Sequence, residues 1–166
     1  MCIRDSPSVD EQQRWRERLK LRNDQPLFFS GLRYAEPRSL HDSTMKVPVG
    51  SNASAFLVTG IADASLLREH VRSLFGQMKH LAFADHHSFS PADQMRIATG
   101  FATFVGPEKT LITTEKDAAR LGSALVNGPM EDIPIAVIGV QAEILNEPHE
   151  FAALLRSHVA THPAHR

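Results

Sequence analysis

The sequence predicts an α/β fold, a mostly parallel sheet with flanking helices, and two observations carry that prediction. Short apolar runs of strand length alternate along the chain with longer segments whose apolar residues recur at helical spacing. The links between most of these segments are short and polar. Such alternation is typical of parallel sheets, because a helix carries the chain back to the start of the next strand.

The predicted strands are the short apolar runs of the sequence. They lie at residues 26–30, 55–59, 79–84, 110–113 and 133–139. Residues 140–145 either continue the last of these strands or pair with it. Residues 31–54 are rich in Pro, Ser, Asp and Gly, which predicts a long loop or a hairpin.

Helix starts are marked by capping residues. The predicted helices lie at residues 8–21, 64–75, 90–104, 116–125 and 148–160. Ser8 with Glu11, and Ser90 with Asp93, have the spacing of a capping box. Gly76 has the position of a residue that stops the second helix.

The composition narrows the classes of function. The chain has 166 residues, 42% hydrophobic and 22% charged, which suffices for a domain with a core. Its 18 basic and 19 acidic side chains give a net charge of −1, so we expect no nucleic-acid partner. Cys2 is the one cysteine, which excludes an internal disulfide. No apolar run reaches the ~18 residues that a membrane-spanning helix needs.

Three polar loops are the candidate functional segments. They follow predicted strands, at residues 59–63, 85–90 and 114–117. The carboxyl ends of parallel strands share one edge of a sheet, and ligands of open α/β sheets bind there. Each loop leads into a helix, whose first N–H groups favour anions such as phosphate. The three loops are therefore expected to meet at one ligand-binding edge.

The richest of these loops contains Asp85, His86 and His87. A carboxylate beside an imidazole fixes its tautomer and raises its basicity, which suits proton transfer near neutral pH. The alternative is a pair of loop histidines that cap a strand or helix through hydrogen bonds. Spacing alone favours this structural alternative.

The loop after the fourth strand contains Thr114, Glu115, Lys116 and Asp117. A lysine there is able to neutralise phosphate charge, and a neighbouring carboxylate is able to hold the lysine in place. The alternative is an ordinary helix start with acids in its first turn and a solvated lysine. Composition alone again favours the structural alternative.

The first loop contains Thr59 and Gly60. It is either a backbone segment that approaches a ligand or a tight strand-to-helix turn in which glycine supplies conformational freedom. A complete phosphate-binding loop, Gly-x-x-x-x-Gly-Lys-Ser/Thr, does not occur anywhere in the chain.

Taken together and in this order, the loops resemble the tetraacyldisaccharide 4'-kinase family of lipid A biosynthesis. The matching segments are Leu57-Val58-Thr59-Gly60-Ile61-Ala62, Phe83-Ala84-Asp85-His86-His87-Ser88-Phe89 and Leu111-Ile112-Thr113-Thr114-Glu115-Lys116-Asp117-Ala118. Phe28-Phe29-Ser30 and the Arg33-Tyr34 after it resemble the branch of the family found in Bacteroidetes. The resemblance covers nearly everything between residues 9 and 160.

The resemblance implies ATP-dependent phosphorylation of the 4'-hydroxyl of tetraacyldisaccharide 1-phosphate to give lipid IVA, with Mg²⁺ as cofactor. It implies that His86 is catalytic together with an aspartate from an N-terminal half. That aspartate takes the sugar hydroxyl proton, His86 supports its charge, and Asp85 orients the loop. The residues implied to line the substrate or nucleotide cleft are Thr59, Gly60, Thr114, Glu115, Lys116 and Asp117.

The implied fold is P-loop-kinase-like, with the phosphate loop and the main Mg²⁺ ligands in that N-terminal half. The chain is therefore expected to be a C-terminal fragment that is inactive alone and holds no metal ligand. Residues 1–8 are expected to be a non-native or disordered start, residues 9–160 the α/β part of the kinase, and residues 161–166 a frayed tail. The family also implies peripheral contact with the cytoplasmic side of the bacterial inner membrane.

Two other functions compete with the kinase. A metal phosphoesterase with an Asp-His-His motif needs an upstream Asp-x-Asp or similar set, and no Asp-x-Asp precedes Asp85. A non-catalytic α/β binding module is favoured only if no upstream domain exists.

Overall fold

The computed structural model describes residues 6–42, 44–125 and 128–161. Contacts divide the chain into two compact units, of which unit 2 is the contiguous stretch Tyr34–Val140. Unit 1 combines Met1–Arg33 with Gln141–Arg166. Most of the predicted start and tail, residues 1–5 and 162–166, lies outside the described residues.

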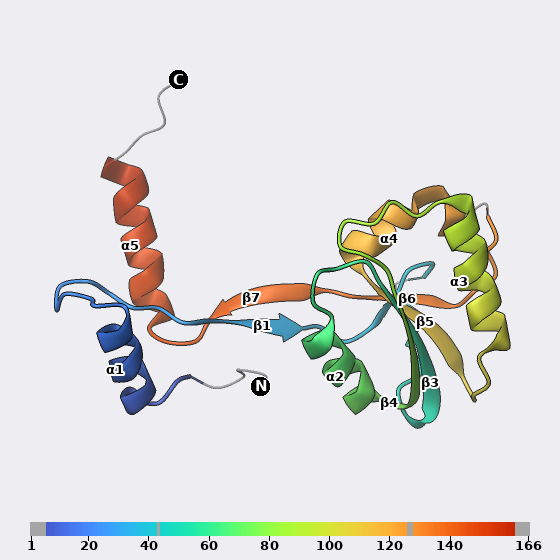
Figure 1. The fold of residues 1–166 in the computed structure, drawn as a ribbon, viewed down its shortest axis with the longest axis horizontal. Coiled ribbons are helices and arrows are strands. Elements are labelled where there is room, and N and C mark those ends of the chain that lie inside the picture. The colour runs from blue at the N-terminus through green and yellow to red at the C-terminus, as the bar shows by residue number, and fades with distance from the viewer. Residues whose placement is uncertain (1–5, 43, 126–127, 162–166) are drawn as a thin grey trace. The chain divides into compact units, whose positions relative to one another are not determined.

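Unit 2 contains a five-stranded sheet in the order β2-β6-β5-β3-β4. Its strands are β2 (Arg38–Ser39), β3 (Gly50–Thr59), β4 (Phe75–Ala82), β5 (Lys109–Thr114) and β6 (Ile135–Ile138). The pairs β3–β4, β3–β5 and β5–β6 are parallel, whereas the short edge strand β2 is antiparallel to β6. The predicted fold class, a mostly parallel α/β sheet with flanking helices, is confirmed (Figure 1).

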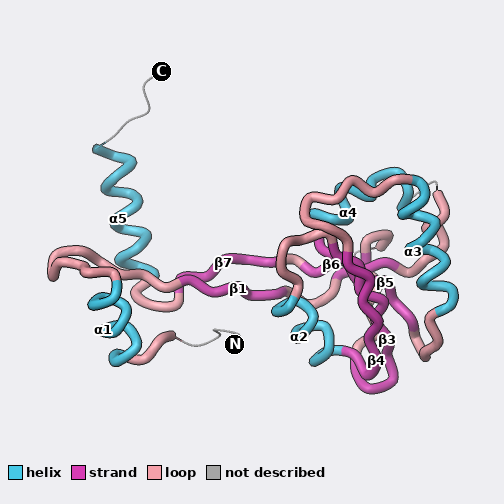
Figure 2. Tube along the Cα trace, viewed as in Figure 1, coloured by secondary structure: helices cyan, strands magenta, loops and turns pink. Residues whose placement is uncertain are grey.

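Helices pack on both faces of this sheet, as Figure 2 shows by colour. They are α2 (Ser65–Leu74), α3 (Pro91–Thr103) and α4 (Glu115–Leu121). On β3, Phe56 and Val58 join the core beneath α3 and α4, whereas Leu57 joins the core beneath α2. Because both faces are covered, the central strands are continuous apolar runs, as in other parallel sheets.

Two helices begin with the predicted capping boxes. In α3 the Ser90 hydroxyl accepts the Asp93 N–H at 3.2 Å, and the Asp93 carboxylate accepts the Ser90 N–H at 2.9 Å. Ser8 and Glu11 form the same reciprocal pair before α1 (Val9–Arg18). Both signals were local in the sequence, because a capping box satisfies backbone N–H groups of a single helical turn.

Gly76 does not stop a helix. α2 ends at Leu74 and β4 begins at the next residue, so Gly76 lies inside the strand. A Cβ atom at this position would collide with the backbone carbonyl of Ser51. The glycine therefore permits a close backbone approach between β3 and β4, a requirement that no local sequence pattern reveals.

The prediction of a buried strand at residues 26–30 was wrong. The strand β1 runs from Ser30 to Tyr34, and the backbone before it bonds to the Asn146 side chain and, at the Phe29 carbonyl, to the Leu145 N–H. The Asn146 amide accepts the Phe29 N–H at 2.6 Å and donates to the Leu27 carbonyl at 2.9 Å. The segment after the last core strand, β7 (Val140–Ile144), pairs with β1 and not with β6.

The predicted helix at 116–125 is also shorter than expected. α4 ends at Leu121, and Gly122 adopts φ 51 and ψ −123, a backbone conformation that glycine reaches more readily than other residues. A single 3-10 turn, Gly122–Leu125, follows.

Unit 1 contains α1, α5 (Pro148–Thr161) and nearly all of the β1–β7 pair. Arg33 and Glu143 form a two-point ion pair, with Nη2–Oε1 at 2.8 Å and Nε–Oε2 at 2.9 Å. The rings of Phe28 and Phe151 meet edge to face with centroids 5.1 Å apart. No hydrophobic side chain is buried among the described residues of unit 1.

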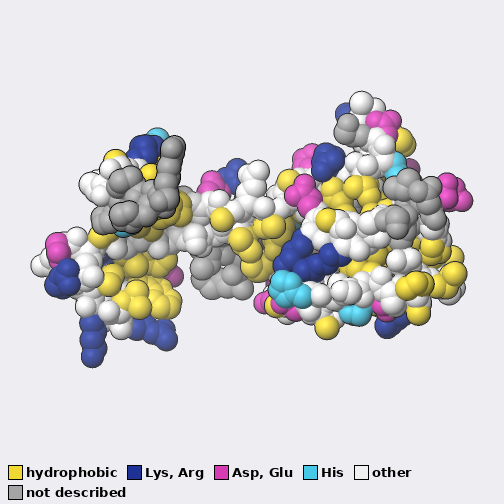
Figure 3. All heavy atoms as spheres, turned by 90° about the horizontal axis from the view of Figure 1, so that it is seen from above, with side chains coloured by type: hydrophobic (Ala, Val, Ile, Leu, Met, Phe, Trp, Pro, Cys, Tyr) yellow, Lys and Arg dark blue, Asp and Glu magenta, His cyan; other side chains and the backbone are white. Residues whose placement is uncertain are grey.

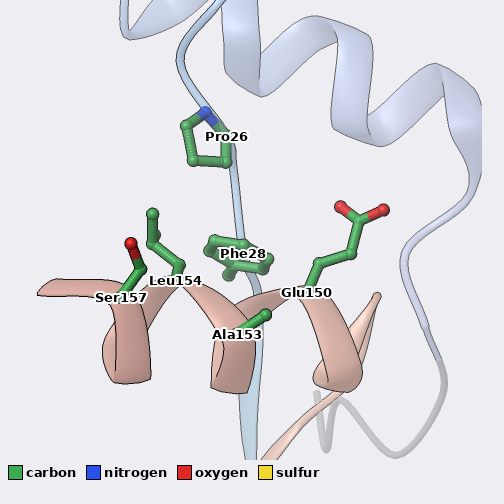
Figure 4. A pocket seen from close by; sticks show the side chains of 6 residues that line it. All are labelled: Pro26, Phe28, Glu150, Ala153, Leu154 and Ser157. Carbon is green, nitrogen blue, oxygen red and sulfur yellow. The ribbon is translucent and has the colours of Figure 1, made fainter. Parts of the chain in front are cut away.

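A shallow groove of unit 1 lies between α5 and the segment before β1. Figure 4 shows the Phe28 ring over α5, with Leu154 and Glu150 on either side. The residues that line the groove are Pro26, Phe28, Glu150, Ala153, Leu154 and Ser157. In the part of the chain that the structure describes, no helix has the length and apolar character needed to span a bilayer.

Candidate functional site

The three loops meet at one edge of the parallel sheet in unit 2. They follow β3, β4 and β5, which end at Thr59, Ala82 and Thr114. A hydrogen bond between Gly60 and Asp117 links the first and third loops directly, and Arg120 of α4 links the loop of His86 to them. The structure thus brings together Gly60, His86 and Asp117, three of the residues that the family resemblance implies for the site.

Asp117 lies at the centre of these contacts, with its side chain fully buried. Its Oδ2 accepts the Gly60 N–H at 2.9 Å and the Thr114 hydroxyl at 2.9 Å. Its Oδ1 accepts a hydrogen bond from Arg120 Nη1 at 3.2 Å. A carboxylate withdrawn from water requires such partners, so Asp117 is a structural anchor that ties α4 to the loop after β3.

Gly60 lies in the same close packing, where a side chain would crowd the Asp117 carboxylate. A Cβ atom there would lie 3.2 Å from Asp117 Oδ1 and 3.5 Å from the Ala84 carbonyl oxygen. The absence of a side chain lets the loop after β3 approach the Asp117 carboxylate closely.

Arg120 joins all three loops, and the sequence analysis missed it. Its Nη1 donates to the Gly60 carbonyl at 3.2 Å and to Asp117, and its Nη2 lies 2.9 Å from His86 Nδ1. Only 22% of its side chain is exposed. The signal that could have found it is the i, i+3 spacing from Asp117, which places both side chains on one helix face.

His86 is the exposed member of the cluster, with 69% of its side chain accessible. Its φ of 57 lies in the left-handed region, which is uncommon for a residue other than glycine. Its backbone N–H donates to Asp85 Oδ1 at 2.9 Å, and its Nε2 lies 3.5 Å from Asp85 Oδ2. One imidazole nitrogen therefore faces a guanidinium and the other faces a carboxylate.

His87 has a different environment from His86. Its ring contacts those of Phe83 and Phe89, with centroids 4.8 and 5.2 Å away. Its Nε2 lies 3.0 Å from Asp93 Oδ2. The pKa of Asp93 is lowered to about 2, first by the Ser90 hydroxyl and then by His87. His87 thus packs the loop against the start of α3.

The Thr59 side chain points away from the other site residues. Alternation on β3 puts Thr59 on the same face as Leu57, beneath α2, where it is buried. Its hydroxyl lies 2.8 Å from His80 Nε2 on β4. Burial lowers the pKa of His80, and the charges of Arg68 and Arg72 on α2 lower it further. The Thr59 hydroxyl is thus part of a contact on the opposite face.

The remaining predicted residues lie at the start of α4. The Thr114 hydroxyl caps the helix by accepting the Asp117 N–H at 3.0 Å. Glu115 is exposed and forms an ion pair with Arg38 at 3.4 Å. Lys116 is exposed, and no hydrogen bond or ion pair links its side chain to another described residue.

The cluster carries cationic and imidazole groups and no metal-binding geometry of its own. No group of three His, Cys, Asp or Glu among the described residues is arranged to hold a metal ion. The Asp85 and Asp117 carboxylates already bind protein N–H and hydroxyl groups. These residues therefore do not fit a Mg²⁺ site by themselves. Figure 3 shows Lys or Arg side chains beside a His side chain on the face of unit 2 seen from above.

The parallel sheet and the polar cluster at its carboxyl edge define the class, a P-loop-kinase-like α/β domain. Comparison with known families narrows this class. The chain belongs to the tetraacyldisaccharide-1-P 4'-kinase family, whose model matches residues 4–160.

Curated relatives carry the same name. The chain is 36% identical to the tetraacyldisaccharide 4'-kinase of Bacteroides thetaiotaomicron over 115 residues, 63% of this chain and 30% of the relative. It is 31% identical to that of Parabacteroides distasonis over 149 residues, 82% of this chain and 38% of the relative. The chain thus spans between 30% and 38% of the length of these two relatives. No solved structure matches it significantly.

Proposed function

We propose that this chain supplies the proton-handling part of a kinase that phosphorylates the 4'-hydroxyl of tetraacyldisaccharide 1-phosphate with ATP, giving lipid IVA in lipid A biosynthesis. The family match and the names of the relatives support this activity. The observation that carries the assignment to particular residues is the exposed His86, held between Arg120 and Asp85 at the ligand-binding edge of the sheet.

Catalysis of phosphoryl transfer consists mainly of positioning and of neutralising charge. Imidazole groups exchange protons near neutral pH, so His86 is suited to support a carboxylate that takes the proton of the sugar hydroxyl. Asp85 bonds the His86 backbone and orients the loop. Lys116, exposed in the first turn of α4, is suited to meet phosphate charge.

The catalytic aspartate, the phosphate loop and the Mg²⁺ ligands are proposed to come from outside these residues, so the chain alone is proposed to be inactive. Mg²⁺, when bound, neutralises phosphate charge in this class of reaction. Because the proposed acceptor is an acylated lipid, the proposed place of action is the cytoplasmic side of the bacterial inner membrane.

The two competing functions are less well supported. In the Asp-His-His motif, His87 is bonded to Asp93 and packed against Phe83, whereas His86 faces Arg120. The three side chains therefore do not converge on one point, as shared metal ligands would have to. A non-catalytic module gives no account of an exposed imidazole held in a left-handed backbone conformation.

A chimeric enzyme tests the proposal. Residues 9–160 replace the matching region of the Parabacteroides distasonis relative, and transfer of labelled phosphate from ATP to the acylated disaccharide is measured. We expect the chimera to be active, the chain alone to be inactive, and His86→Asn in the chimera to lose on the order of a hundredfold in kcat. His41→Gln, an exposed histidine outside the three loops, is the matched control.

Each of these three expected results has its own contradicting outcome. Lipid IVA formation by the chain alone would contradict the proposed incompleteness. Full activity of the His86→Asn chimera would remove His86 from catalysis. A folded chimera without any kinase activity would count against the proposed function itself.

A further inference from the structure

We propose that Arg120 is a positioning residue that fixes the tautomer and the orientation of the His86 imidazole. Its value for catalysis rests on the kinase function proposed above, whereas its effect on the imidazole is a property of this chain alone.

Hydrogen bonds to two of the loops hold one end of the guanidinium, and its other end contacts the third loop. Nη1 donates to the Gly60 carbonyl and to Asp117 Oδ1, both at 3.2 Å. Asp117 is itself held by the Gly60 N–H and the Thr114 hydroxyl, and it is fully buried. A planar guanidinium with one end fixed in this way has little freedom to turn, so the direction of its Nη2–H groups is fixed too.

The fixed Nη2 lies 2.9 Å from His86 Nδ1. A guanidinium is a donor only, so Nδ1 must be the acceptor and the proton of the neutral imidazole must reside on Nε2. The position of the proton follows from the chemistry of the pair, because arginine has no acceptor atom. The pair therefore selects one of the two neutral tautomers.

The selected tautomer leaves Nε2–H as the available group. Nε2 lies 3.5 Å from Asp85 Oδ2, beyond a short hydrogen bond, and the side chain is 69% exposed. A donor at this position is suited to a substrate oxygen or to a carboxylate supplied by another part of the enzyme. The left-handed φ of 57 at His86 places the ring against Arg120, and the loop is held there by the Asp85–His86 backbone bond. Asp117 thus acts on His86 through Arg120.

Nitrogen-15 NMR of the chain tests the tautomer directly. At alkaline pH, where free histidines are neutral, we expect His86 to show a single tautomer with an unprotonated Nδ1. The exposed His149 serves as an internal reference and is expected to show the mixture of a free histidine. A His86 signal that matches His149 in the unmodified chain would overturn the proposal without any need of a variant.

Arg120→Lys separates the anchor from the donor. A lysine ammonium is able to pair with Asp117, but a single nitrogen cannot occupy the positions of both Nη1 and Nη2. We therefore expect the fold to persist and the tautomer preference of His86 to be lost. Arg96→Lys is the matched control, because Arg96 lies over the Phe83 ring at 5.5 Å, and among the described contacts it has no hydrogen bond or ion pair with His86.

The chimeric kinase tests the catalytic consequence. Arg120→Lys is expected to lower kcat on the order of tenfold while KM for ATP stays unchanged, because misplacing a reacting group affects the chemical step. Undiminished kcat, or an unchanged His86 tautomer, in Arg120→Lys would overturn the positioning role. If the unmodified chimera has no activity, the kinase function fails, and the NMR result still decides the role of Arg120.

Discussion

Unit 2 and unit 1 are built from similar elements but are held together by different forces. Unit 2 buries apolar side chains on both faces of its sheet, whereas no hydrophobic side chain is buried in the described residues of unit 1. Unit 1 relies on the α1 capping box, the Asn146 amide and the Arg33–Glu143 ion pair. Because burial of apolar surface is the dominant stabilising term, unit 2 should set the cooperative stability of the chain.

Hydrophobic side chains in unit 1 remain at its surface, as Figure 3 shows. The exposed ones include Val9, Trp15, Leu19, Leu154, Leu155 and Val159. Short helices are marginal without tertiary packing, so α1 and α5 are expected to open more readily than any helix of unit 2. This difference can be tested by paired substitutions, one in each unit.

The largest effect is expected from truncating the core of unit 2. Leu57→Ala removes a fully buried side chain beneath α2 and should lower the free energy of unfolding by about 3 kcal/mol. The same change at Leu154, 49% exposed in unit 1, should cost less than about 0.5 kcal/mol. Urea unfolding followed by circular dichroism measures both. Equal losses would mean that the two units share one core.

Asp117→Asn should have the next largest effect, about 2 kcal/mol, because it leaves Arg120 without its buried counter-charge. Glu115→Gln is the matched control, since Glu115 is 61% exposed and its ion pair with Arg38 is worth little. Thermal unfolding of both variants gives the comparison. A loss in Glu115→Gln as large as that in Asp117→Asn would contradict the anchoring role of the buried carboxylate.

The two capping boxes provide a smaller and closely matched pair. Ser90→Ala and Ser8→Ala should each cost about 1 kcal/mol of helix stability. In unit 2 the loss should lower the global unfolding midpoint, whereas in unit 1 it should appear only as faster amide exchange in α1. A lowered midpoint in Ser8→Ala would show that α1 belongs to the cooperative core.

The smallest expected difference between the units is in how their stability changes as the pH falls. The folded pKa of Asp93 is about 2, below the unfolded value of about 3.9. Its stabilising effect is therefore complete above the unfolded pKa and is lost as the pH falls through the folded pKa. In Asp93→Asn, the urea midpoint should therefore decrease less than in the unmodified chain as the pH falls from about 4 to about 2. The pKa of Glu11 is lowered too, first by the Ser8 N–H, so acid should loosen α1 only locally.

Local signals predicted the fold class and both capping boxes, because apolar periodicity and caps depend on nearby residues. Predictions from the sequence failed where contacts between distant residues determine the local structure. Asn146 accepts the Phe29 N–H and donates to the Leu27 carbonyl, two bonds that a predicted strand would have made to a neighbouring strand. Gly76 is required by the close approach of Ser51 in the neighbouring strand and not by the end of α2.

The candidate site divides in the same way. Strand order predicted that the loops of Gly60, His86 and Asp117 would meet, since parallel strands end at one edge. The direction of each side chain was not predictable. Thr59 faces α2, and Arg120, which no motif marked, supplies the link between the loops.

The division of the chain also orders events during synthesis. Unit 2 is continuous in sequence, whereas the Phe29–Asn146 bond of unit 1 joins residues 117 positions apart. As the chain leaves the ribosome, the parallel sheet can therefore assemble while the first segment of unit 1 still waits for its partner. Leu27 and Phe29 lack the Asn146 amide until almost the whole chain has been made, so the segment before β1 is the expected contact of chaperones on the nascent chain.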